Sequence, residues 1–474
     1  MVIQNLFLGT KKKNFTRALV DGDWERFNYY ASMIRVLKLG QRVGPSIGED
    51  ADVYIHLDVF AALQGYSDRK GVKCLVPNLR EAILAYYMDE SFIRDSVPHL
   101  RCLLPQGLRS FFFEDPHSGF VQSKDACEAV ASLIIQSCSN IVDFGVGSST
   151  FFDSIDNSHL LKLQLPKLEN IYGCLGSTRK EAIRHLGSLP SLKSIQVLSL
   201  EKDTDMTSFA TADGLFKSME RLKLGTLSGA RAAALFNSMR CRFRELDIKI
   251  PRPTFIDERL IGEIIPDSHH LQDLTSTLTS NAFLRESLKT FKISDARGGY
   301  KLYADSELPP STFQPLLSLR ALQHVILRLV GLEHLNDAWL EEAAIAWPDL
   351  RTLIINETEN CFSLKGLIPL LKNCRRITTL ELYPTASHFD LSVLPADGGA
   401  SNTNVTGIFS LHKVEGDKMD PDALFACLTS MFPNVRGVKI ADINSVSFDE
   451  EYEEKWEILE QRFKEKFPSL SAEI

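Results

Sequence analysis

The sequence has no long apolar segment and no excess of basic residues, and each absence excludes a class of protein. No window of the 474 residues offers the about 18 uncharged apolar positions that a membrane-spanning helix needs. Acidic residues outnumber basic ones by 61 to 53, which gives a net charge of −8. A large positive field for nucleic acid or for an anionic membrane is therefore absent, and we expect neither as a partner.

Closely spaced cysteines are also missing. The 9 cysteines are odd in number, scattered, and never arranged as Cys-x-x-Cys. Zinc clips and redox motifs need that spacing, because one loop must deliver two sulfurs to one centre. Most of these cysteines sit among apolar residues, as in the segment from Ile134 to Cys138, which predicts buried free thiols. Lys11 to Lys13 come after the first apolar run, the reverse of a secretory signal, so we expect a cytoplasmic or nuclear protein.

Motifs that carry catalysis are missing as well. The sequence has no Walker phosphate loop, no His-Glu-x-x-His, no Gly-x-Ser-x-Gly and no calcium loop. Gly145-Val146-Gly147 matches only part of a dinucleotide fingerprint, and the carboxylates beside His269-His270 are more simply loop solubilisers. We therefore expect no catalytic residue, no cofactor and no metal.

One pattern is abundant: apolar-x-x-apolar-x-apolar recurs along the whole chain, mostly at intervals of about 24 to 34 residues. Examples are Leu79/Ala82/Leu84, Ile141/Phe144/Val146 and Leu322/Val325/Leu327, and degenerate copies are Leu168/Ile171/Gly173 and Val405/Ile408/Ser410. The last two apolar positions are two residues apart, which places both on the buried face of a short strand. The residue between them points to the opposite face.

Segments with helical apolar spacing, such as 364–374, follow many of these strands, and turns such as Trp347-Pro348-Asp349 precede the next strand. The sequence therefore predicts an α/β fold, a leucine-rich-repeat solenoid. We expect a horseshoe with parallel β-strands on its concave face and helices on its convex face. Variable repeat lengths favour the irregular, ribonuclease-inhibitor-like subclass. The alternative is one or two doubly wound α/β domains.

The repeats also predict a division of the chain. Residues 1–33 form an N-terminal capping helix region, 34–446 the irregular array, and 447–474 a C-terminal capping helix. Long insertions lie near 251–284, 294–312 and 384–404. Because all three leave from the carboxyl ends of strands, we expect them along one rim of the solenoid.

The repeat register predicts which side chains face inward. The expected concave positions are Lys38, Glu81, Phe112, Asp143, Arg221, Lys223, Glu245, Asp247, Lys292, His324, Thr352, Thr379, Glu381, Phe409 and Lys439. Two interpretations stay open. In the first, cross-strand ion pairs join Arg221 to Glu245 and Lys223 to Asp247. In the second, these concave residues recognise a protein partner.

Loops on rigid scaffolds commonly carry recognition, so partner-binding residues are expected on the rim and on the concave face. The candidates, chosen among aromatic and charged residues, are Tyr300, Tyr303, His324, Glu381, His388 and Phe389.

The segment from Asp23 to Leu37 has the order Trp-x-x-Phe-x-x-Tyr-Ala followed by Arg-x-Leu. This segment, with the closing stretch from Phe432 to Trp456, resembles the F-box/leucine-rich-repeat proteins of mushroom-forming fungi. The resemblance implies a substrate-recognition module, part of an F-box-like component of a cullin–RING ubiquitin ligase, that binds a protein substrate.

The family's F-box, which docks on a Skp-type adaptor, has no recognisable counterpart before Asp21. The resemblance therefore implies adaptor binding only where an F-box lies upstream. The alternative function is a stand-alone leucine-rich-repeat scaffold or inhibitor unconnected to ubiquitin ligation. A hydrolase or transferase with an unrecognised site is the third class.

Overall fold

The computed structural model describes residues 12–13, 20–39, 54–55, 57–85, 97–114, 124–146, 155, 165–173, 180–197, 215–225, 229–250, 268–295, 308–329, 332, 334–356, 362–382, 401–405, 408–412, 420–434, 437–441 and 450–466. The chain divides into two compact units. The first comprises Met1–Gly225 with Ser238–Cys241, and the second comprises Thr226–Asn237 with Arg242–Ile474. Each unit is described by itself.

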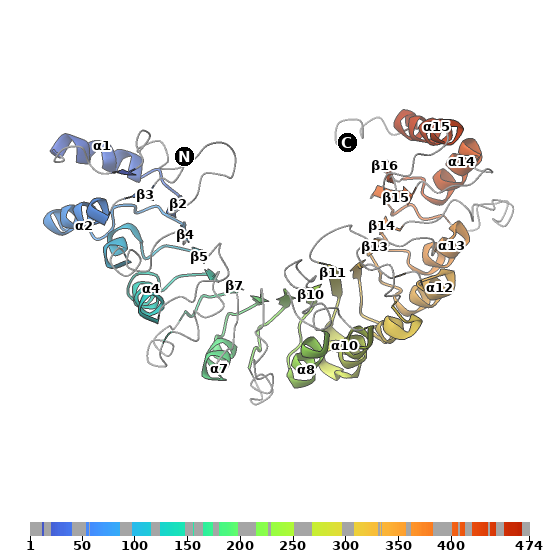
Figure 1. Cartoon of the computed structure of the whole chain (residues 1–474), viewed down its shortest axis with the longest axis horizontal. Coiled ribbons are helices and arrows are strands. Elements are labelled where there is room, and N and C mark those ends of the chain that lie inside the picture. Colours follow the sequence, from blue (N-terminus) through green and yellow to red (C-terminus); the bar gives the residue numbers. More distant parts are fainter. Residues whose placement is uncertain are drawn as a thin grey trace, which may run out of the picture. The chain divides into compact units, whose positions relative to one another are not determined.

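The first unit is a parallel sheet whose strands pair in chain order. The strands are β2 (Val36–Leu39), β4 (Glu81–Ala85), β5 (Ser110–Glu114), β6 (Asp143–Val146), β7 (Asn170–Gly173), β8 (Ser194–Val197) and β9 (Arg221–Leu224). β1 (Lys12–Lys13) and β3 (Tyr54–Ile55) form a separate parallel pair. Its helical elements are α1 (Asp21–Ala31), α2 (Leu57–Lys70), η2 (Arg101–Leu103), α4 (Lys124–Ser137) and α7 (Lys180–Ser188). In Figure 1, α2, α4 and α7 lie on the same side of these strands.

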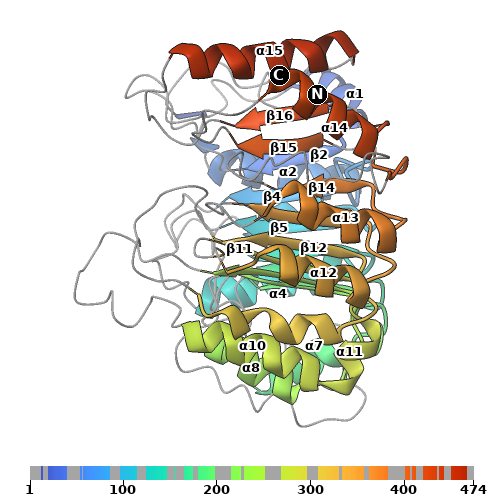
Figure 2. The same cartoon turned by 90° about the vertical axis from the view of Figure 1, so that its right-hand side faces the viewer.

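The second unit repeats this arrangement. Its parallel strands are β10 (Glu245–Ile250), β11 (Thr290–Asp295), β12 (His324–Arg328), β13 (Thr352–Asn356) and β14 (Thr379–Glu381), and β15 (Ile408–His412) pairs with β16 (Gly437–Ala441). Its helical elements are α8 (Gly229–Ser238), α10 (Ser268–Ser280), α11 (Ala282–Ser287), η5 (Pro310–Thr312), η6 (Gln314–Ser318), α12 (Asp337–Ala346), α13 (Leu364–Asn373), α14 (Pro421–Met431) and α15 (Glu450–Lys466). Figure 2 shows α12 and α13 stacked one above the other beside the strands that precede them.

The apolar triplets form the core. Leu322, Val325 and Leu327 are each 0% exposed, and the residues between them on β12 are half-buried. Within each unit the strands follow one another without a switch point, which is the order of a repeat array and not of a doubly wound sheet. The chain is therefore an α/β leucine-rich-repeat solenoid, as predicted. The predicted division into caps, array and insertions stays a prediction.

A backbone hydrogen-bond ladder fixes the register of consecutive repeats. Before β2, β4 to β8 and β10 to β13, the carbonyl oxygen of the preceding residue accepts two N–H groups from the next repeat. Arg80 O accepts from Arg109 N at 2.9 Å and from Ser110 N at 3.0 Å. In the second unit, Lys289 O accepts from Gln323 N at 2.7 Å and from His324 N at 3.0 Å. Residues just before the strands are consequently stacked in one column.

Side chains in the turns add a second connection between repeats. In the first unit, Asn78 Nδ2 donates to Ser32 O at 2.7 Å and Asn140 Nδ2 donates to Gln106 O at 2.9 Å. In the second unit, Asn281 Nδ2 donates to Phe236 O at 2.8 Å. These bonds give carbonyl oxygens near the ends of α1 and α8 and in the turn before β5 a side-chain donor from the next repeat.

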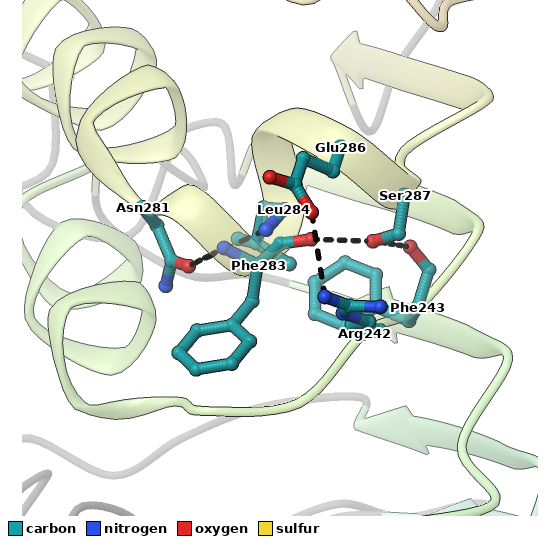
Figure 3. Close-up of polar contacts among 7 residues, drawn as sticks. All are labelled: Arg242, Phe243, Asn281, Phe283, Leu284, Glu286 and Ser287. Atoms are coloured by element: carbon teal, nitrogen blue, oxygen red, sulfur yellow. Dashed lines mark hydrogen bonds and ion pairs between the residues drawn. The ribbon is translucent and has the colours of Figure 1, made fainter.

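Figure 3 shows how α11 is tied to Arg242 and Phe243, which precede β10. Asn281 is the N-cap, and its Oδ1 accepts from Phe283 N at 3.0 Å and Leu284 N at 3.3 Å. At the other end of the helix, Ser287 Oγ donates to Phe243 O at 3.0 Å, and Arg242 forms a 3.3 Å ion pair with Glu286. Asn281 therefore serves both as a helix cap and as a link to the preceding repeat.

We expect Asn281→Ala to destabilise α11 by about 2 kcal/mol, because it removes both the cap and the bond to Phe236. Asn281→Ser keeps a capping oxygen and should cost about half as much. The measurement is the free energy of local opening from hydrogen exchange at Phe283 and Leu284. Ser280→Ala, at the neighbouring exposed position, is the control. Equal effects of the Ala and Ser variants at Asn281 would contradict the capping role.

Candidate functional site

The strand face opposite the buried triplets is the candidate site, and we call it the inner face. Inner-face residues alternate with core residues along each strand, as Glu81 and Ile83 do with Ala82 and Leu84 on β4. In Figure 1 the labelled helices of each unit lie on the other side of its strands. Side chains at one register position therefore line up across neighbouring strands.

A chain of polar contacts crosses the inner face of the first unit. Ser110 Oγ donates to Asp143 Oδ2 at 2.8 Å, and Asn170 Nδ2 donates to Asp143 Oδ1 at 2.7 Å. Arg221 Nη2 reaches Asn170 Oδ1 at 3.4 Å, past the register position of Ser194. We call Ser110, Asp143, Asn170 and Arg221 the polar ladder. Both carboxylate oxygens of Asp143 are hydrogen-bonded, which fixes its orientation.

Two aromatic rings lie beside the polar ladder. Phe112 and Tyr172 share a register position with Gly145 between them, and their ring centroids are 5.8 Å apart. A Cβ atom on Gly145 would lie 2.2 Å from Phe112 Cδ1, so the Phe112 ring occupies the space above the glycine. Both rings are half-buried. We call Phe112 and Tyr172 the aromatic pair.

The surroundings of Tyr172 keep its phenol protonated. Burial raises the pKa of Tyr172, the negative charge of Asp143 raises it further, and Arg221 partly offsets both. The hydroxyl therefore stays a hydrogen-bond donor at neutral pH, available to an acceptor on a ligand.

The inner face of the second unit carries ion pairs around an apolar strip. Lys292 Nζ lies 3.0 Å from Glu245 Oε1, and Arg328 Nη2 lies 3.9 Å from Glu381 Oε2. Between them, Ile326 and Ile354 are partners in the register of β12 and β13. Glu245, Lys292 and Glu381 are half-buried, so these pairs limit side-chain freedom more than they stabilise the fold.

His324 lies on the same inner face, beside Thr352. Its Nδ1 lies 3.0 Å from Thr352 Oγ1 on the neighbouring strand. Burial lowers the pKa of His324, and the cations Arg351 and Lys292 lower it further, against a smaller opposing effect of Glu245. The imidazole is therefore neutral at physiological pH.

The structure places His324 on β12 and Glu381 on β14, both on the inner face of the second unit with β13 between them. The other candidate partner-binding residues, Tyr300, Tyr303, His388 and Phe389, lie outside the described residues. Two expected ion pairs stay predictions, because their partners belong to different units: Arg221 with Glu245, and Lys223 with Asp247.

Two of the expected inner-face positions do not share a register. Phe409 and Lys439 were both expected on the inner face. In the structure Phe409 is the register partner of Val438, and Ser410 is the partner of Lys439. Paired residues in parallel strands share a face, so Phe409 and Lys439 do not both lie on the inner face.

Sequence reasoning missed Ser110, Asn170 and Tyr172. Each occupies a position adjacent to a buried residue of its strand, since Phe111 and Ile171 are 0% and 1% exposed. The alternation of buried and inner-face residues that identified Phe112 and Asp143 could also have identified these three. The residues of β7 were not included because the apolar triplet of that strand ends in Gly173.

The described cysteines are not activated as nucleophiles. Burial raises the pKa of Cys102, Cys138, Cys241 and Cys374 to about 12, so these thiols are protonated. The four side chains are buried and unpaired by disulfides, as predicted. Within the described part of the chain, no group of three His, Cys, Asp or Glu side chains is placed to hold a metal. Among the helices described, none combines the length and apolar character needed to cross a membrane.

Comparison with known proteins gives no family. No family model matches the chain, and no curated protein matches its sequence. Among solved structures, an internalin from Listeria monocytogenes is 13% identical, with coverage of 88% of this chain and 89% of its own and a TM-score of 0.35. A leucine-rich-repeat protein of Leptospira interrogans is 12% identical, with coverage of 85% and 97% and a TM-score of 0.30. The fold assignment rests on strand order, register and burial.

We expect Gly145→Ala to displace the Phe112 ring and to destabilise the first unit by about 1–3 kcal/mol, because the new methyl group overlaps the ring. The measurement is the amide exchange of β5 and β6, with the thermal midpoint as support. Gly107→Ala is the matched control, since nothing lies within 4 Å of its added Cβ. Equal behaviour of the two variants would contradict the packing of Phe112 over Gly145.

A lowered pKa of His324 predicts a pH-dependent stability. The unfolded chain binds a proton near the ordinary pKa of 6.5 and the folded chain only at lower pH, so acidification through 6.5 favours unfolding. Wild type should therefore lose more stability than His324→Gln between pH 7.5 and 5.5. Titration of a histidine-selectively labelled sample by NMR checks the direction. A His324 pKa at or above 6.5 would refute it.

Proposed function

We propose that this chain is a non-enzymatic protein-interaction solenoid whose inner face binds a protein partner. The aromatic pair on the first unit carries this proposal. Phe112 is a large apolar ring on a strand face whose neighbouring register position holds Asp143 and Asn170, and Gly145 is the residue that lets the ring lie there. Partly buried aromatic rings beside fixed polar groups are typical interface anchors.

The polar ladder supports binding in a second way. Its hydrogen bonds hold Asp143 and Asn170 in one arrangement before any partner arrives. A preorganised surface loses little side-chain entropy on association, which favours affinity. In the second unit, His324 and Glu381 are proposed contacts for the same reason, and the rim residues Tyr300, Tyr303, His388 and Phe389 are proposed with them.

The finer proposal is that the partner is a ligase substrate and that the chain is the recognition module of an F-box-like component of a cullin–RING ubiquitin ligase. Its support is the N-terminal segment that carries the family resemblance. Trp24 of α1 is buried and stacks on Tyr66 of α2 with 3.8 Å between ring centroids. Asn28 Nδ2 donates to Tyr66 Oη at 3.0 Å. These contacts join α1, which carries the resemblance, to α2 of the repeat array.

The test is capture of partners from crosslinked cells, compared between wild type and the double variant Phe112→Ser/Tyr172→Ser. We expect the double variant to lose at least about tenfold of the captured protein, because interface anchors commonly contribute 2 kcal/mol or more. Tyr29→Ser is the matched control, since Tyr29 is an aromatic residue of the first unit that is 62% exposed on α1. Undiminished capture by a folded double variant would contradict the proposal.

The same samples test the finer proposal. A Skp-type adaptor should be recovered with an upstream-extended chain and not with residues 1–474 alone. Adaptor recovery with neither chain, while partner capture persists, would favour the stand-alone scaffold or inhibitor.

A further inference from the structure

The residue before each strand forms a column of its own at the amino-terminal edge of the sheet. In the first unit, the first three members of that column are Arg35, Arg80 and Arg109. Arg35 O accepts from Arg80 N at 2.8 Å, and Arg80 O accepts from Arg109 N at 2.9 Å, so the backbone holds the three in succession. All three side chains are exposed. We call these residues the arginine column.

The arginine column gathers like charges that the described part of the chain does not neutralise. Arg35 Nη1 donates to the carbonyl oxygens of Ser32 at 3.0 Å and Ile34 at 3.3 Å, and no ion pair with a carboxylate is formed by any of the three within the described residues. Like charges directly opposite on neighbouring strands are destabilising. Among the described residues this repulsion is not relieved, and an anionic ligand would relieve it.

Further along the same column the charges do pair. Glu169 O accepts from Lys193 N at 2.8 Å, and the side chains of Lys193 and Glu169 form an ion pair at 2.9 Å. Side chains at this position can therefore neutralise one another between adjacent repeats, as Lys193 and Glu169 do. At Arg35, Arg80 and Arg109 the sequence places three cations instead.

The second unit has cations at the same repeat position. Arg244 O accepts from Lys289 N at 2.9 Å, and Arg351 follows two strands later; all three side chains are exposed. Cations before the strands therefore recur in a chain whose net charge is −8.

We propose that the arginine column binds an acidic, extended peptide segment of the protein partner. This inference rests on the proposed function and names the chemistry of its ligand. Strands about 4.8 Å apart place the outer arginines about 10 Å from one another, which about three extended residues span. Each guanidinium presents a planar fork that matches a carboxylate.

A peptide fits the charges of the whole molecule better than a larger polyanion does. The net charge of −8 opposes a long nucleic acid or an anionic membrane surface, whose field extends over many residues. A short acidic segment needs only the column itself. The aromatic pair begins on β5, the strand that Arg109 precedes, so one partner can contact both.

The test is binding of a fluorescein-labelled hexaglutamate peptide to the full chain, followed by anisotropy. We expect Arg80→Gln/Arg109→Gln to weaken binding by about tenfold or more, since each substitution removes a charge-assisted contact. Affinity should fall as salt rises, because the contacts are exposed. Arg184→Gln, an exposed arginine on α7 of the same unit, is the matched control and should bind as wild type does.

Three results would overturn the inference. They are equal binding of hexaglutamine, undiminished hexaglutamate binding by the folded double arginine variant, and tighter binding of a single-stranded oligonucleotide through the same arginines. Cellular capture separates this inference from the proposed function. Capture that needs Phe112 and Tyr172 but survives loss of Arg80 and Arg109 would refute the acidic ligand and leave the protein-binding role intact.

Discussion

The rest of each unit depends on a pair of backbone hydrogen bonds, in which the carbonyl oxygen of the residue before a strand accepts two N–H groups of the next repeat. In the first unit, Arg109 O accepts from Val142 N at 2.7 Å and from Asp143 N at 3.0 Å, and the same pair of bonds precedes β10 to β13 of the second unit. Two bonds to one oxygen fix both the position and the direction of the next strand. A slip by one residue would break them and would also expose every buried triplet. Hydrogen bonding and apolar burial therefore select the same register.

That register turns a repeated sequence into a patterned surface. Residues at one repeat position become neighbours although the chain between them is long, as Asp143 and Asn170 do through a 2.7 Å hydrogen bond. The arginine column, the polar ladder and the aromatic pair each follow from one repeat position of the first unit. The fold supplies the spacing, and the side chains supply the charge, hydrogen-bonding and apolar character of each column.

Most of the fold was predictable because the spacing of buried residues repeats along the chain. The triplet Leu322, Val325 and Leu327, for example, predicts a strand and which of its faces is buried. Individual contacts were less predictable. The packing of Phe112 over Gly145 depends on which strand lies next to β5 and cannot be read from either residue alone. The expected inner-face positions Phe409 and Lys439 proved incompatible, because the segment of Phe409 offers two apolar registers one residue apart and only the strand pairing relates it to Lys439. The arginines were visible in the sequence, but their stacking follows from the backbone ladder.

Hydroxyl-radical footprinting, with and without the captured partner, tests most directly whether the inner face is the binding surface. In the free protein, Phe112 and Tyr172 should be oxidised, whereas their core-facing neighbours Phe111 and Ile171, at 0% and 1% exposure, should not. With the partner bound, Phe112 and Tyr172 should become protected while the exposed Tyr29 keeps its reactivity. Unchanged oxidation of the aromatic pair in the complex would contradict the account.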